Sequence, residues 1–530
     1  MAAGGTGRDE MYDVIIVGGG HNGLVAGAYL AKAGRKVLVV ERAAAAGGFA
    51  QSAPVIPEAP DHLVNTGTGH LLSLHGSKVV GELELARHGL KTIPDDPMYA
   101  YLAPDGATVA MFRDVRRTAD DFAQGSKADG QAYLEFMELI GALMEFGAVV
   151  AAGEPGVRGP RFYVDFAKVA IRNRRLKAKL ELIRSAPADQ LAMEWFEHPH
   201  NQALMLGVVA GIGPFDVDGN GLAYGAFGLY HFLGASNPVG GMRAVAGAFL
   251  GAYREAGGEL MTGAQVAEIV IADGACRGVR LADGKVIEAR AVIGACAPQI
   301  VAQLATPGGL DRVTQTRLDY APANRWNIGP SLMNVASRRA ITVKARHRRA
   351  DGVSLDETVG LIGTAAELQA GLAQARRGMV PETPVFSVLP LCDPRLEVAP
   401  AGQGLAYIYM PVFPVELNDG WGNQKAPAGD AIVRRAAEHY DGFDAELGRW
   451  FETPPEREAR TGSPNGIASQ VDFGAFRMGA NRPAFGLGGA KPLASGLFLG
   501  GAGSAPGGGV SGNPGRLAAS RVGAFLDRGR

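Results

Sequence analysis

Short apolar runs at the start of the chain follow the pattern of a parallel sheet. Residues 13–17 (DVIIV) and 36–40 (KVLVV) are rich in Val and Ile, as strands buried on both faces are. Residues 24–33 between them have a helical pattern, and Gly34 stands where helices commonly end. The order strand, helix, strand predicts a βαβ unit.

Similar patterns recur in the middle of the chain and near its end. A helix and several strand-like runs are predicted between residues 243 and 294, with Asp283-Gly284 as a tight hairpin turn. A short apolar strand at 497–499 precedes a predicted helix at 516–526. The predicted elements of the middle part are a helix at 243–256 and strands at 259–261, 266–271, 276–281, 285–289 and 291–294.

The stretches between these blocks have a different pattern. Residues 132–151 and 162–183 carry apolar side chains at i, i+3 and i+4, which predicts amphipathic helices. Residues 385–389 and 406–412 are strand-like, and a helix is predicted around 431–450. We therefore expect an α/β protein in which a Rossmann-like domain carries an inserted domain of mixed sheet and helices, with the sheet as a floor and the helices as a roof.

Length, charge and cysteine content narrow the class of protein. A chain of 530 residues is long enough for two connected domains, and its 52 basic and 53 acidic residues create no overall field that favours nucleic acid. Cys276, Cys296 and Cys392 form no CxxC pair, which argues against a disulphide framework, a structural zinc and a redox-active dithiol. A polar N-terminus and the lack of a long uncharged apolar run favour a cytoplasmic protein.

Two basic runs keep contact with a membrane surface open. Residues 172–177 (RNRRLK) lie on a predicted helix with Leu and Ile neighbours, a pattern of solvated faces and also of helices that lie on anionic lipid. Residues 346–349 are interpreted as a charged loop. Neither run has interleaved aromatic residues, so neither indicates nucleic-acid binding. Peripheral membrane association of a cytoplasmic protein and the oligomeric state both stay open.

The strongest motif is the G-x-G-x-x-G turn between the first strand and the first helix. Gly18 permits the tight turn, Gly20 lets the backbone approach a pyrophosphate, and Gly23 lets the helix pack closely on the strand. The helix N-terminus offers unpaired N–H groups and a partial positive charge to the phosphates. His21 and Asn22 are expected to serve these phosphates through their backbone N–H groups.

An acidic residue completes the motif. Glu41 ends the second strand, 18 residues beyond Gly23, where a carboxylate accepts hydrogen bonds from a ribose diol. An acid at this position disfavours a 2′-phosphate and therefore NADP. The arrangement predicts a dinucleotide with free ribose hydroxyls, and Arg42 is included among the predicted contacts.

Gly47-Gly48 follows Glu41 after six residues, in the stretch ERAAAAGGFAQS. This arrangement of an acid and a glycine pair resembles the second FAD motif of the flavin-dependent desaturase and amine oxidase superfamily. The resemblance implies that FAD is the cofactor and that the pair lies near its pyrophosphate and flavin. Members often carry Arg after the pair, whereas this chain has Phe49, so an arginine contact is not expected there.

Two further blocks resemble the phytoene desaturase family. Residues 496–516 (GLFLGGAGSAPGGGVSGNPGR) resemble its C-terminal FAD motif, which implies a loop that closes over the ribityl chain and the flavin ring. A P-x-GGM sequence at 238–242, followed by helix, strand and hairpin, implies that the backbone of Val266 contacts the adenine. The residues implied in the C-terminal loop are Ala502, Gly503, Ser504, Gly509 and Val510.

Together the blocks resemble the phytoene desaturase-like flavoproteins, and most closely the branch of the pyridine nucleotide–disulphide oxidoreductase domain-containing proteins. The implied fold is a Rossmann-like FAD-binding domain of the glutathione-reductase/amine-oxidase type with an inserted substrate domain. Without a cysteine pair or a second GxGxxG, a disulphide reductase fed by NADPH is disfavoured. The predicted segments are an FAD-binding domain at 1–110, 236–300 and 473–530, and a substrate domain at 111–235, which is helical, and 301–472.

Three side chains are candidates for catalysis beside the flavin. His70 follows the glycine pair at a distance that brings it near the ring, and Tyr230 and His231 lie shortly before the block at residue 237. Arg477 and Arg482 precede the last strand and are candidates for the flavin edge. A structural role is the alternative for each, and no metal site is predicted.

The leading hypothesis is an FAD-dependent dehydrogenase or desaturase that transfers a hydride from a lipophilic organic substrate to flavin N5. Oxygen, a quinone or another acceptor would take the electrons. Three alternatives stay open: a double-bond isomerase that uses reduced FAD without net redox, an amine oxidase, and a non-catalytic flavin-binding protein that binds a partner. The expected partners are an apolar small molecule and an electron acceptor, and not nucleic acid.

Overall fold

The structure is a computed structural model that describes residues 11–528 except 154, 156, 157 and 475. Two seven-stranded sheets form its centre, and each is assembled from segments that are far apart in the sequence. None of the helices in these described ranges is both long enough and apolar enough to cross a bilayer.

The first sheet is built around the N-terminal strand β1. It pairs in parallel with β12 on one side and β2 on the other, where Val14 lies opposite Ala291 and Val37. β20 and β9 extend the parallel part at its edges, while β10, β11 and the first half of β12 form an antiparallel meander. The strands are β1 (Tyr12–Val17), β2 (Val37–Val40), β9 (Glu259–Met261), β10 (Val266–Ala272), β11 (Ala275–Leu281), β12 (Val286–Gly294) and β20 (Leu497–Leu499).

Helices cover both faces of this sheet. Val14 and Ile16 of β1 belong to one apolar cluster, Ile15 and Val17 to another, and all four are buried. Burial on both faces explains why the strand is a continuous apolar run rather than an alternating one. The helices on the first face are α1 (His21–Lys32), α10 (Met242–Glu255) and α16 (Asn513–Arg528), and those on the second are α11 (Pro298–Leu304) and α12 (Arg312–Asp319).

The second sheet has the strand order β19-β13-β17-β16-β15-β6-β7 and is antiparallel except where β15 pairs with β6. Ala406 and Ile408 of β17 belong to the cluster that includes α14 (Lys425–His439), whereas Leu405 and Tyr407 face the opposite side. The strands are β6 (Tyr99–Leu102), β7 (Thr108–Met111), β13 (Ile328–Ser337), β15 (Val359–Ile362), β16 (Phe386–Pro390), β17 (Gly404–Pro414) and β19 (Glu446–Glu452).

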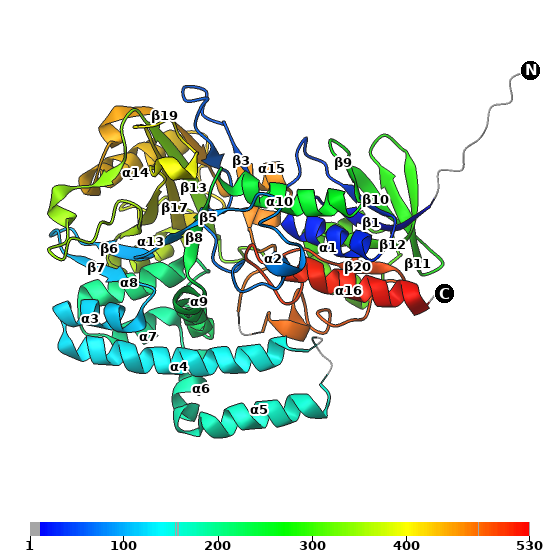
Figure 1. Cartoon of the computed structure of the whole chain (residues 1–530), viewed down its shortest axis with the longest axis horizontal. Helices are drawn as coiled ribbons and strands as arrows, with labels where there is room; N and C mark the ends of the chain where they lie inside the picture. Colours follow the sequence, from blue (N-terminus) through cyan, green and yellow to red (C-terminus); the bar gives the residue numbers. More distant parts are fainter. Residues whose placement is uncertain (1–10, 154, 156–157, 475, 529–530) are drawn as a thin grey trace, which may run out of the picture.

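A group of helices from the middle of the chain covers the Tyr407 face of the second sheet. The first helix of this group, α3, begins after Asp114, whose side chain caps it by accepting hydrogen bonds from the N–H groups of Arg116 and Arg117. In Figure 1 this group extends below the sheet, with α5 at its outer edge. The helices are α3 (Val115–Gly125), α4 (Lys127–Ala151), α5 (Pro160–Arg172), α6 (Lys177–Ser185), α7 (Ala188–Trp195), α8 (Pro199–Ala210) and α9 (Gly225–Leu233).

Short elements connect the two sheets. The hydroxyl of Tyr407 donates to the carbonyl of Gly67 at 2.7 Å, and the side chain of Asn334 donates to the carbonyl of Asn65 at 3.4 Å. The loop after β4 therefore lies against the second sheet. The remaining elements outside the two sheets are β3 (Ser52–Ala53), β4 (Val64–Asn65), α2 (Val79–Glu82), β5 (Thr92–Asp95), β8 (Ala235–Pro238), β14 (Thr342–Val343), α13 (Ala365–Arg376), β18 (Tyr440–Asp441) and α15 (Pro454–Thr461).

The predicted helix at 162–183 is interrupted in the structure. α5 ends at Arg172, and the side-chain amide of Asn173 donates to the carbonyl of Val169 and to Glu145. Asparagine competes in this way with the hydrogen bonds of a helix interior. The chain continues through a short 3-10 turn into α6.

Three further elements differ from the prediction. The helix predicted at 431–450 ends at His439, because the chain turns at Gly442, whose φ of 99° favours glycine, and then forms β19. The strands predicted at 285–289 and 291–294 are the single strand β12. β6 and β7 lie mostly within the segment 1–110 predicted for the first domain, yet they pair in the second sheet.

Candidate functional site

The glycine turn connects β1 to α1. Gly18 has a φ of 106°, a conformation that L side chains rarely adopt. A Cβ on Gly23 would lie 2.1 Å from the carbonyl oxygen of Gly18, so only glycine fits where the helix meets the turn. The fold itself therefore requires these two glycines.

Gly20 is different. Its φ of −68° is open to any residue, and a Cβ there would meet nothing closer than Gly48 Cα at 4.0 Å. The fold thus has no need of glycine at this position. A ligand group that approaches the backbone, as a pyrophosphate does at the N-terminus of a helix, would explain why residue 20 is a glycine.

Glu41 is joined to the turn. Its two carboxylate oxygens accept hydrogen bonds from the backbone N–H of Gly19 at 2.7 Å and of Ala43 at 2.8 Å. A carboxylate has about four lone-pair sites, so positions remain for a ribose diol. The guanidinium of Arg42 instead donates to the carbonyls of Ala459 and Arg460 at the C-terminus of α15. Contact of the Arg42 side chain with a cofactor stays a prediction.

The glycine pair lies beside the turn. The N–H of Gly47 donates to the carbonyl of Gly19 at 2.8 Å, and Gly20 and Gly47 form an isolated parallel bridge. Gly47 and Gly48 have φ values of 139° and 59°, in the region that favours glycine. The structure therefore brings together the two N-terminal glycine segments.

The C-terminal glycine loop reaches the same place. A Cβ on Gly18 would lie 3.4 Å from the carbonyl carbon of Ala295, and one on Gly501 would lie 2.8 Å from the carbonyl oxygen of Ala295. The end of β12 thus lies between the two loops. The backbone of Gly509 lies close enough to the ring of His21 to raise its pKa against the larger lowering by burial, so the loop adjoins the turn here as well.

Polar atoms at the turn lack partners. His21 Nε2 and Asn22 Oδ1 are buried without a hydrogen bond within the described part of the chain, and burial lowers the pKa of His21 to about 4. A Cβ on Gly515 would lie 2.1 Å from the carbonyl oxygen of Asn22, so the first turns of α1 and α16 adjoin. Two helix N-termini, unpaired polar atoms and the open side of Gly20 suit the pyrophosphate of FAD.

The other predicted contacts in the C-terminal loop have local partners. The N–H of Gly503 donates to Gln470 Oε1 at 2.8 Å, and the hydroxyl of Ser504 donates to the carbonyl of Gly501 at 2.7 Å. Ala502 and Val510 are buried. With its hydroxyl already bonded, Ser504 offers a cofactor mainly its backbone. Sequence patterns did not indicate Gln470, which is isolated from every glycine motif.

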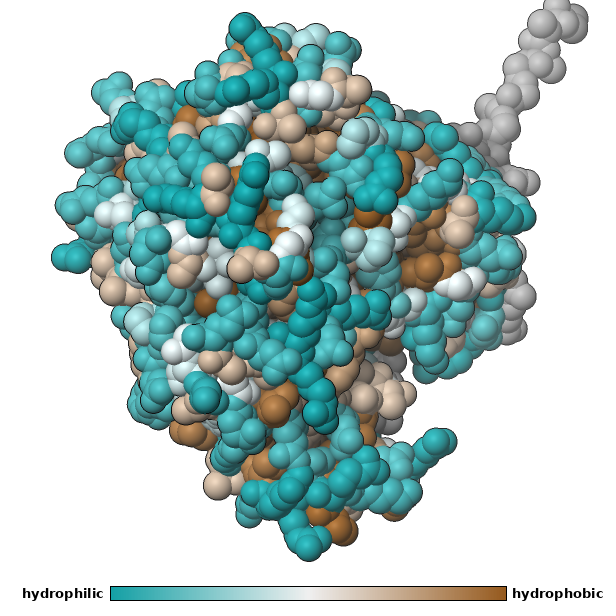
Figure 2. Space-filling view, turned by 60° about the vertical axis from the view of Figure 1, so that its left-hand side comes forward, coloured by the Kyte–Doolittle hydropathy of each residue, from teal (hydrophilic) through white to brown (hydrophobic). Residues whose placement is uncertain are grey.

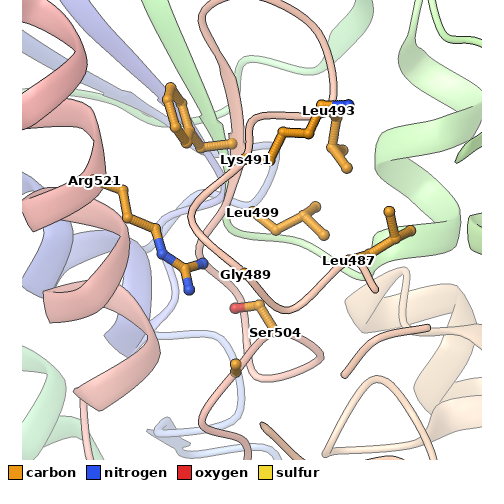
Figure 3. A pocket seen from close by; sticks show the side chains of 9 residues that line it. Leu487, Gly489, Lys491, Leu493, Leu499, Ser504 and Arg521 are labelled. Atoms are coloured by element: carbon orange, nitrogen blue, oxygen red, sulfur yellow. The ribbon is translucent and has the colours of Figure 1, made fainter. Parts of the chain in front are cut away.

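A small cavity lies behind this loop (Figure 3). Its volume of about 10 Å³ has room for roughly one water molecule, so it is no substrate site. A larger groove of about 290 Å³ between α4, α7 and α8 includes Met193 and Trp195 and lies far from the glycine segments (Figure 1). The residues that line the small cavity include Leu487, Lys491, Leu499, Ser504 and Arg521.

Val266 starts β10 close to the end of β2. The N–H of Ala264 donates to the carbonyl of Glu41 at 3.0 Å, and that of Gly263 donates to the carbonyl of Ala43 at 2.9 Å. Val266 is itself buried. The predicted adenine contact is therefore two residues from a segment bonded to Glu41, and it stays a prediction.

His70 lies with tyrosines at the junction of the two sheets. Its ring is 6.0 Å from that of Tyr99 and 6.3 Å from that of Tyr230, edge to face in both cases. The hydroxyls of Tyr99 and Tyr230 are 2.7 Å apart. Burial lowers the pKa of His70 to about 4, so its imidazole is neutral at pH 7. Of the predicted catalytic residues, His70 and Tyr230 are brought together.

His231 is turned away from this group. Its Nε2 hydrogen-bonds to the hydroxyl of Tyr133 at 2.6 Å, and its Nδ1 to the carbonyl of Arg113 at 2.9 Å. Nε2 thus holds α9 against α4, and Nδ1 holds it against the loop between β7 and α3. The structure gives His231 a structural environment rather than one shared with His70.

Four tyrosines near His70, which we call the tyrosine wall, have hydroxyls that are uncharged at pH 7: Tyr99, Tyr230, Tyr407 and Tyr409. The hydroxyl of Tyr409 donates to the carbonyl of Gly211 at 3.0 Å, and burial raises the pKa of Tyr409 and Tyr230 to about 12 each. Tyr407 and Tyr409 project from one face of β17, as alternate residues of a strand do. Sequence reasoning missed Tyr99, Tyr407 and Tyr409, although the spacing of two in YIY was the available signal.

Arg482 is fully buried, and its guanidinium donates to the carbonyls of Ser469, Val471 and Ala502 at 2.8–3.1 Å. Burial lowers its pKa to about 10. Arg482 therefore organises the backbone beneath the C-terminal loop. The side chain of Arg477 has no hydrogen bond in the described part of the chain, but its carbonyl accepts one from Arg482 at 3.4 Å.

The chain is similar to known oxidoreductases over nearly all of its length. A family model described as an NAD(P)-binding Rossmann-like domain matches residues 16–83. Pyridine nucleotide-disulfide oxidoreductase domain-containing protein 2 of Rattus norvegicus is 27% identical over 558 aligned residues, which cover 96% of this chain and 93% of the relative. One of the subunits of limonene dehydrogenase from Castellaniella defragrans is 27% identical, with 96% of this chain and 94% of the relative covered.

Solved structures share the fold. A variant of putrescine oxidase has a TM-score of 0.63 at 14% identity, with 98% of this chain and 99% of that chain covered. An oxidoreductase from Methanosarcina mazei has a TM-score of 0.59 at 16% identity, with 96% and 99% covered. The predicted fold class is confirmed: a Rossmann-like domain with an inserted domain of sheet and helices, as in the amine oxidases. The resemblance to the FAD-dependent oxidoreductases is likewise confirmed.

Proposed function

We propose that the protein binds FAD and oxidises a lipophilic organic molecule by hydride transfer. The observation that carries this proposal is Gly20, which faces open space at the point where three glycine segments meet. A dinucleotide whose pyrophosphate lies against the backbone would require glycine there, because a side chain would block its approach. Glu41 would hold the ribose, and the adjoining N-termini of α1 and α16 would attract the phosphates.

The wall of tyrosines supports an apolar substrate. The hydroxyls of Tyr407 and Tyr409 already donate to backbone carbonyls, and those of Tyr99 and Tyr230 bond to each other. Only one hydroxyl hydrogen of the Tyr99–Tyr230 pair remains for another acceptor. Aromatic rings with satisfied hydroxyls would hold a hydrocarbon and exclude water. One relative is named for limonene, a hydrocarbon.

Bound FAD would supply the hydride acceptor at N5. His70 would take the proton where one leaves with the hydride, because its imidazole is neutral and makes no hydrogen bond to the described residues. Tyr99 and Tyr230 would hold the imidazole by edge-to-face contact. The base would be weak, which suits a reaction in which hydride loss runs ahead of proton loss.

The test is anaerobic reduction of the purified holoprotein. Limonene and other hydrocarbons are added without oxygen, and the flavin absorbance is followed. Bleaching with the appearance of a product two hydrogens lighter supports the proposal. A yellow protein that no apolar molecule bleaches refutes the substrate class, and a colourless protein that takes up no flavin refutes the cofactor.

Amine oxidation is the second candidate. The tyrosine wall favours it too, because aromatic faces attract alkylammonium groups, and the fold is shared with putrescine oxidase and cyclohexylamine oxidase. Hydrogen peroxide production with amines, and none with hydrocarbons, would select this candidate. The absence of both activities would leave the isomerase and the partner-binding protein.

A further inference from the structure

Helix α5 has two apolar faces, of which one has no covering element. Phe162, Phe166 and Val169 lie on one side of the helix, where the rings of Phe166 and Phe146 of α4 are 5.1 Å apart, Val169 is buried and Phe166 is 40% exposed. Tyr163 and Ile171 turn outward and are 60% and 64% exposed. The outer face of a helix that covers a globular protein is normally polar, so this one is exceptional.

The outward apolar face is continuous. Val164, Ala167 and Ile171 follow one another at spacings of three and four, and Tyr163 lies four before Ala167, so all four share one side of the helix. All four are exposed. Lys168, one turn from Val164, lies at the edge of this face. Apolar residues bounded by cations are the pattern of a helix that lies in a membrane interface.

Positive charge is concentrated in the arm that α5 and α6 form. Residues 158–184 hold nine basic and two acidic residues, which leaves 43 basic and 51 acidic residues for the rest of the chain. Arg172 and Lys179 are paired with Glu145 and Glu135 of α4, at 3.0 and 3.2 Å. Arg174 and Lys177 have no ion pair among the described residues. The arm is thus positive on a body that is net negative.

A second group of exposed apolar residues reaches the arm. Phe476 is 84% exposed and Phe485 67%, and this segment continues to Gly489, where a Cβ would lie 3.3 Å from the carbonyl oxygen of Pro155. Phe473, in the same segment, packs against Gly508, where a Cβ would lie 2.6 Å from its ring. The exposed Phe476 and Phe485 therefore belong to a segment that contacts the C-terminal glycine loop at one end and the chain just before α5 at the other. Figure 2 shows hydrophobic side chains among hydrophilic ones on the lower part of the molecule, where the arm lies.

We propose that this surface, the outward face of α5 together with Phe476 and Phe485, seats the protein on a bilayer that contains anionic lipid, with α5 in the plane of the interface. A second copy of the chain would bring two positive arms together, which electrostatic repulsion opposes. An anionic bilayer satisfies both the apolar face and the surrounding charge. The proposal deepens the proposed function, because a lipophilic substrate could then enter from the lipid, but the binding itself needs no catalysis.

The test is co-sedimentation of the full-length holoprotein with vesicles of phosphatidylcholine, with and without phosphatidylglycerol. Binding is expected only with phosphatidylglycerol, and it should weaken as salt shortens the Debye length to about 3 Å near 1 M. Tyr163→Ser with Ile171→Ser should lower the partition coefficient about tenfold or more. Arg174→Glu with Lys177→Glu should lower it at least tenfold, since each basic residue contributes about fivefold.

The matched control is Val286→Ser with Met379→Ser, two apolar residues that are 45% and 40% exposed and lie at the start of β12 and after α13. This variant should bind vesicles as the unmodified protein does. Circular dichroism and thermal unfolding verify that every variant is folded. Equal binding by the Tyr163/Ile171 variant, no binding to any vesicle, or an α5-dependent dimer in sedimentation velocity would each overturn the proposal. None of these results depends on flavin content or turnover, so the proposed function is tested separately.

Discussion

The backbone N–H of Gly19 donates to a carboxylate oxygen of Glu41 at 2.7 Å, so the acid at the end of β2 supports the glycine turn at the end of β1. The same side chain also accepts the N–H of Ala43 at 2.8 Å. Glu41 thus organises the two strand ends that a dinucleotide would span. Its predicted role toward ribose and its observed role toward the turn are separable by substitution.

Glu41→Gln keeps an oxygen that can accept the N–H of Gly19 but removes the charge. Its amide nitrogen cannot accept the N–H of Ala43, so the FAD-free protein loses one hydrogen bond. Since a hydrogen bond to a charged group contributes about 1.5–3 kcal/mol, we expect FAD affinity to fall by roughly ten- to a hundredfold, with a small drop in the unfolding midpoint of the FAD-free protein. Glu41→Ala should lower the unfolding midpoint further, because it leaves both backbone N–H groups unpaired. Fluorescence titration of FAD and thermal unfolding of the FAD-free protein measure the two effects. Unchanged affinity in Glu41→Gln would contradict the ribose assignment.

Gly20→Ala tests the cofactor site with the least damage to the fold. The backbone at Gly20 accepts alanine, and the new Cβ would meet only Gly48 Cα at 4.0 Å, so the FAD-free protein should unfold at the same temperature. The methyl group would occupy the space predicted for the pyrophosphate, and flavin content after purification should drop to near zero. Absorbance of the flavin per mole of protein measures this.

The control for Gly20→Ala is Gly141→Ala in α4, where a Cβ has no neighbour within 4 Å. That variant should keep its flavin and gain about 0.5–1 kcal/mol of stability, because alanine is the better helix former. Full flavin occupancy in Gly20→Ala would mean that no ligand passes against this part of the backbone.

The parts of the fold that the sequence predicted are those governed by local patterns. The continuous apolar runs at 13–17 and 36–40 predict strands because both faces of that sheet are buried. Glycines such as Gly23, which is required because a Cβ would collide with the neighbouring backbone, are also predictable from the local motif. The helix predicted at 431–450 is wrong at its end, since pairing with β13, about 120 residues away, makes residues 446–452 a strand.

The candidate site was only partly readable. The glycine motifs predicted which segments meet, because glycine is needed where backbones approach closely. The wall around His70 was not predicted, since Tyr99 of β6 and Tyr230 of α9 are about 130 residues apart and meet only when α9 packs on the second sheet. His231 looked equivalent to Tyr230 in sequence. Neighbours on a helix point in different directions, and His231 faces α4 instead.

His70 and His231 should respond differently to the same substitution. His70→Asn is expected to lower kcat by about a hundredfold, within the range for a lost general base, while flavin content and the unfolding midpoint stay the same. His231→Asn loses at least one buried hydrogen bond, to Tyr133 or to the Arg113 carbonyl, so it should destabilise the fold by about 1–3 kcal/mol. Its turnover per bound flavin should be unchanged. Anaerobic flavin reduction rates and thermal unfolding separate the two, and a reversal of these outcomes would exchange the two roles.

Asp95 gives the stability of the protein a dependence on pH. Burial raises the pKa of its carboxyl to about 7, and one oxygen accepts from Asn237 at 2.8 Å while the other has no partner in the described part of the chain. The folded state therefore holds a proton that the unfolded state releases near pH 4, so the contribution of this group to stability falls as pH rises from about 4 to about 7.

Asp95→Asn tests this dependence, because asparagine cannot ionise and its side-chain oxygen can still accept from Asn237. The variant should unfold at a higher temperature than the unmodified protein at pH 8, and the difference should be markedly smaller at pH 5. Asp419→Asn, at an exposed turn, is the control and should change neither midpoint. A stabilisation by Asp95→Asn that is as large at pH 5 as at pH 8 would show that packing, and not the buried proton, is responsible.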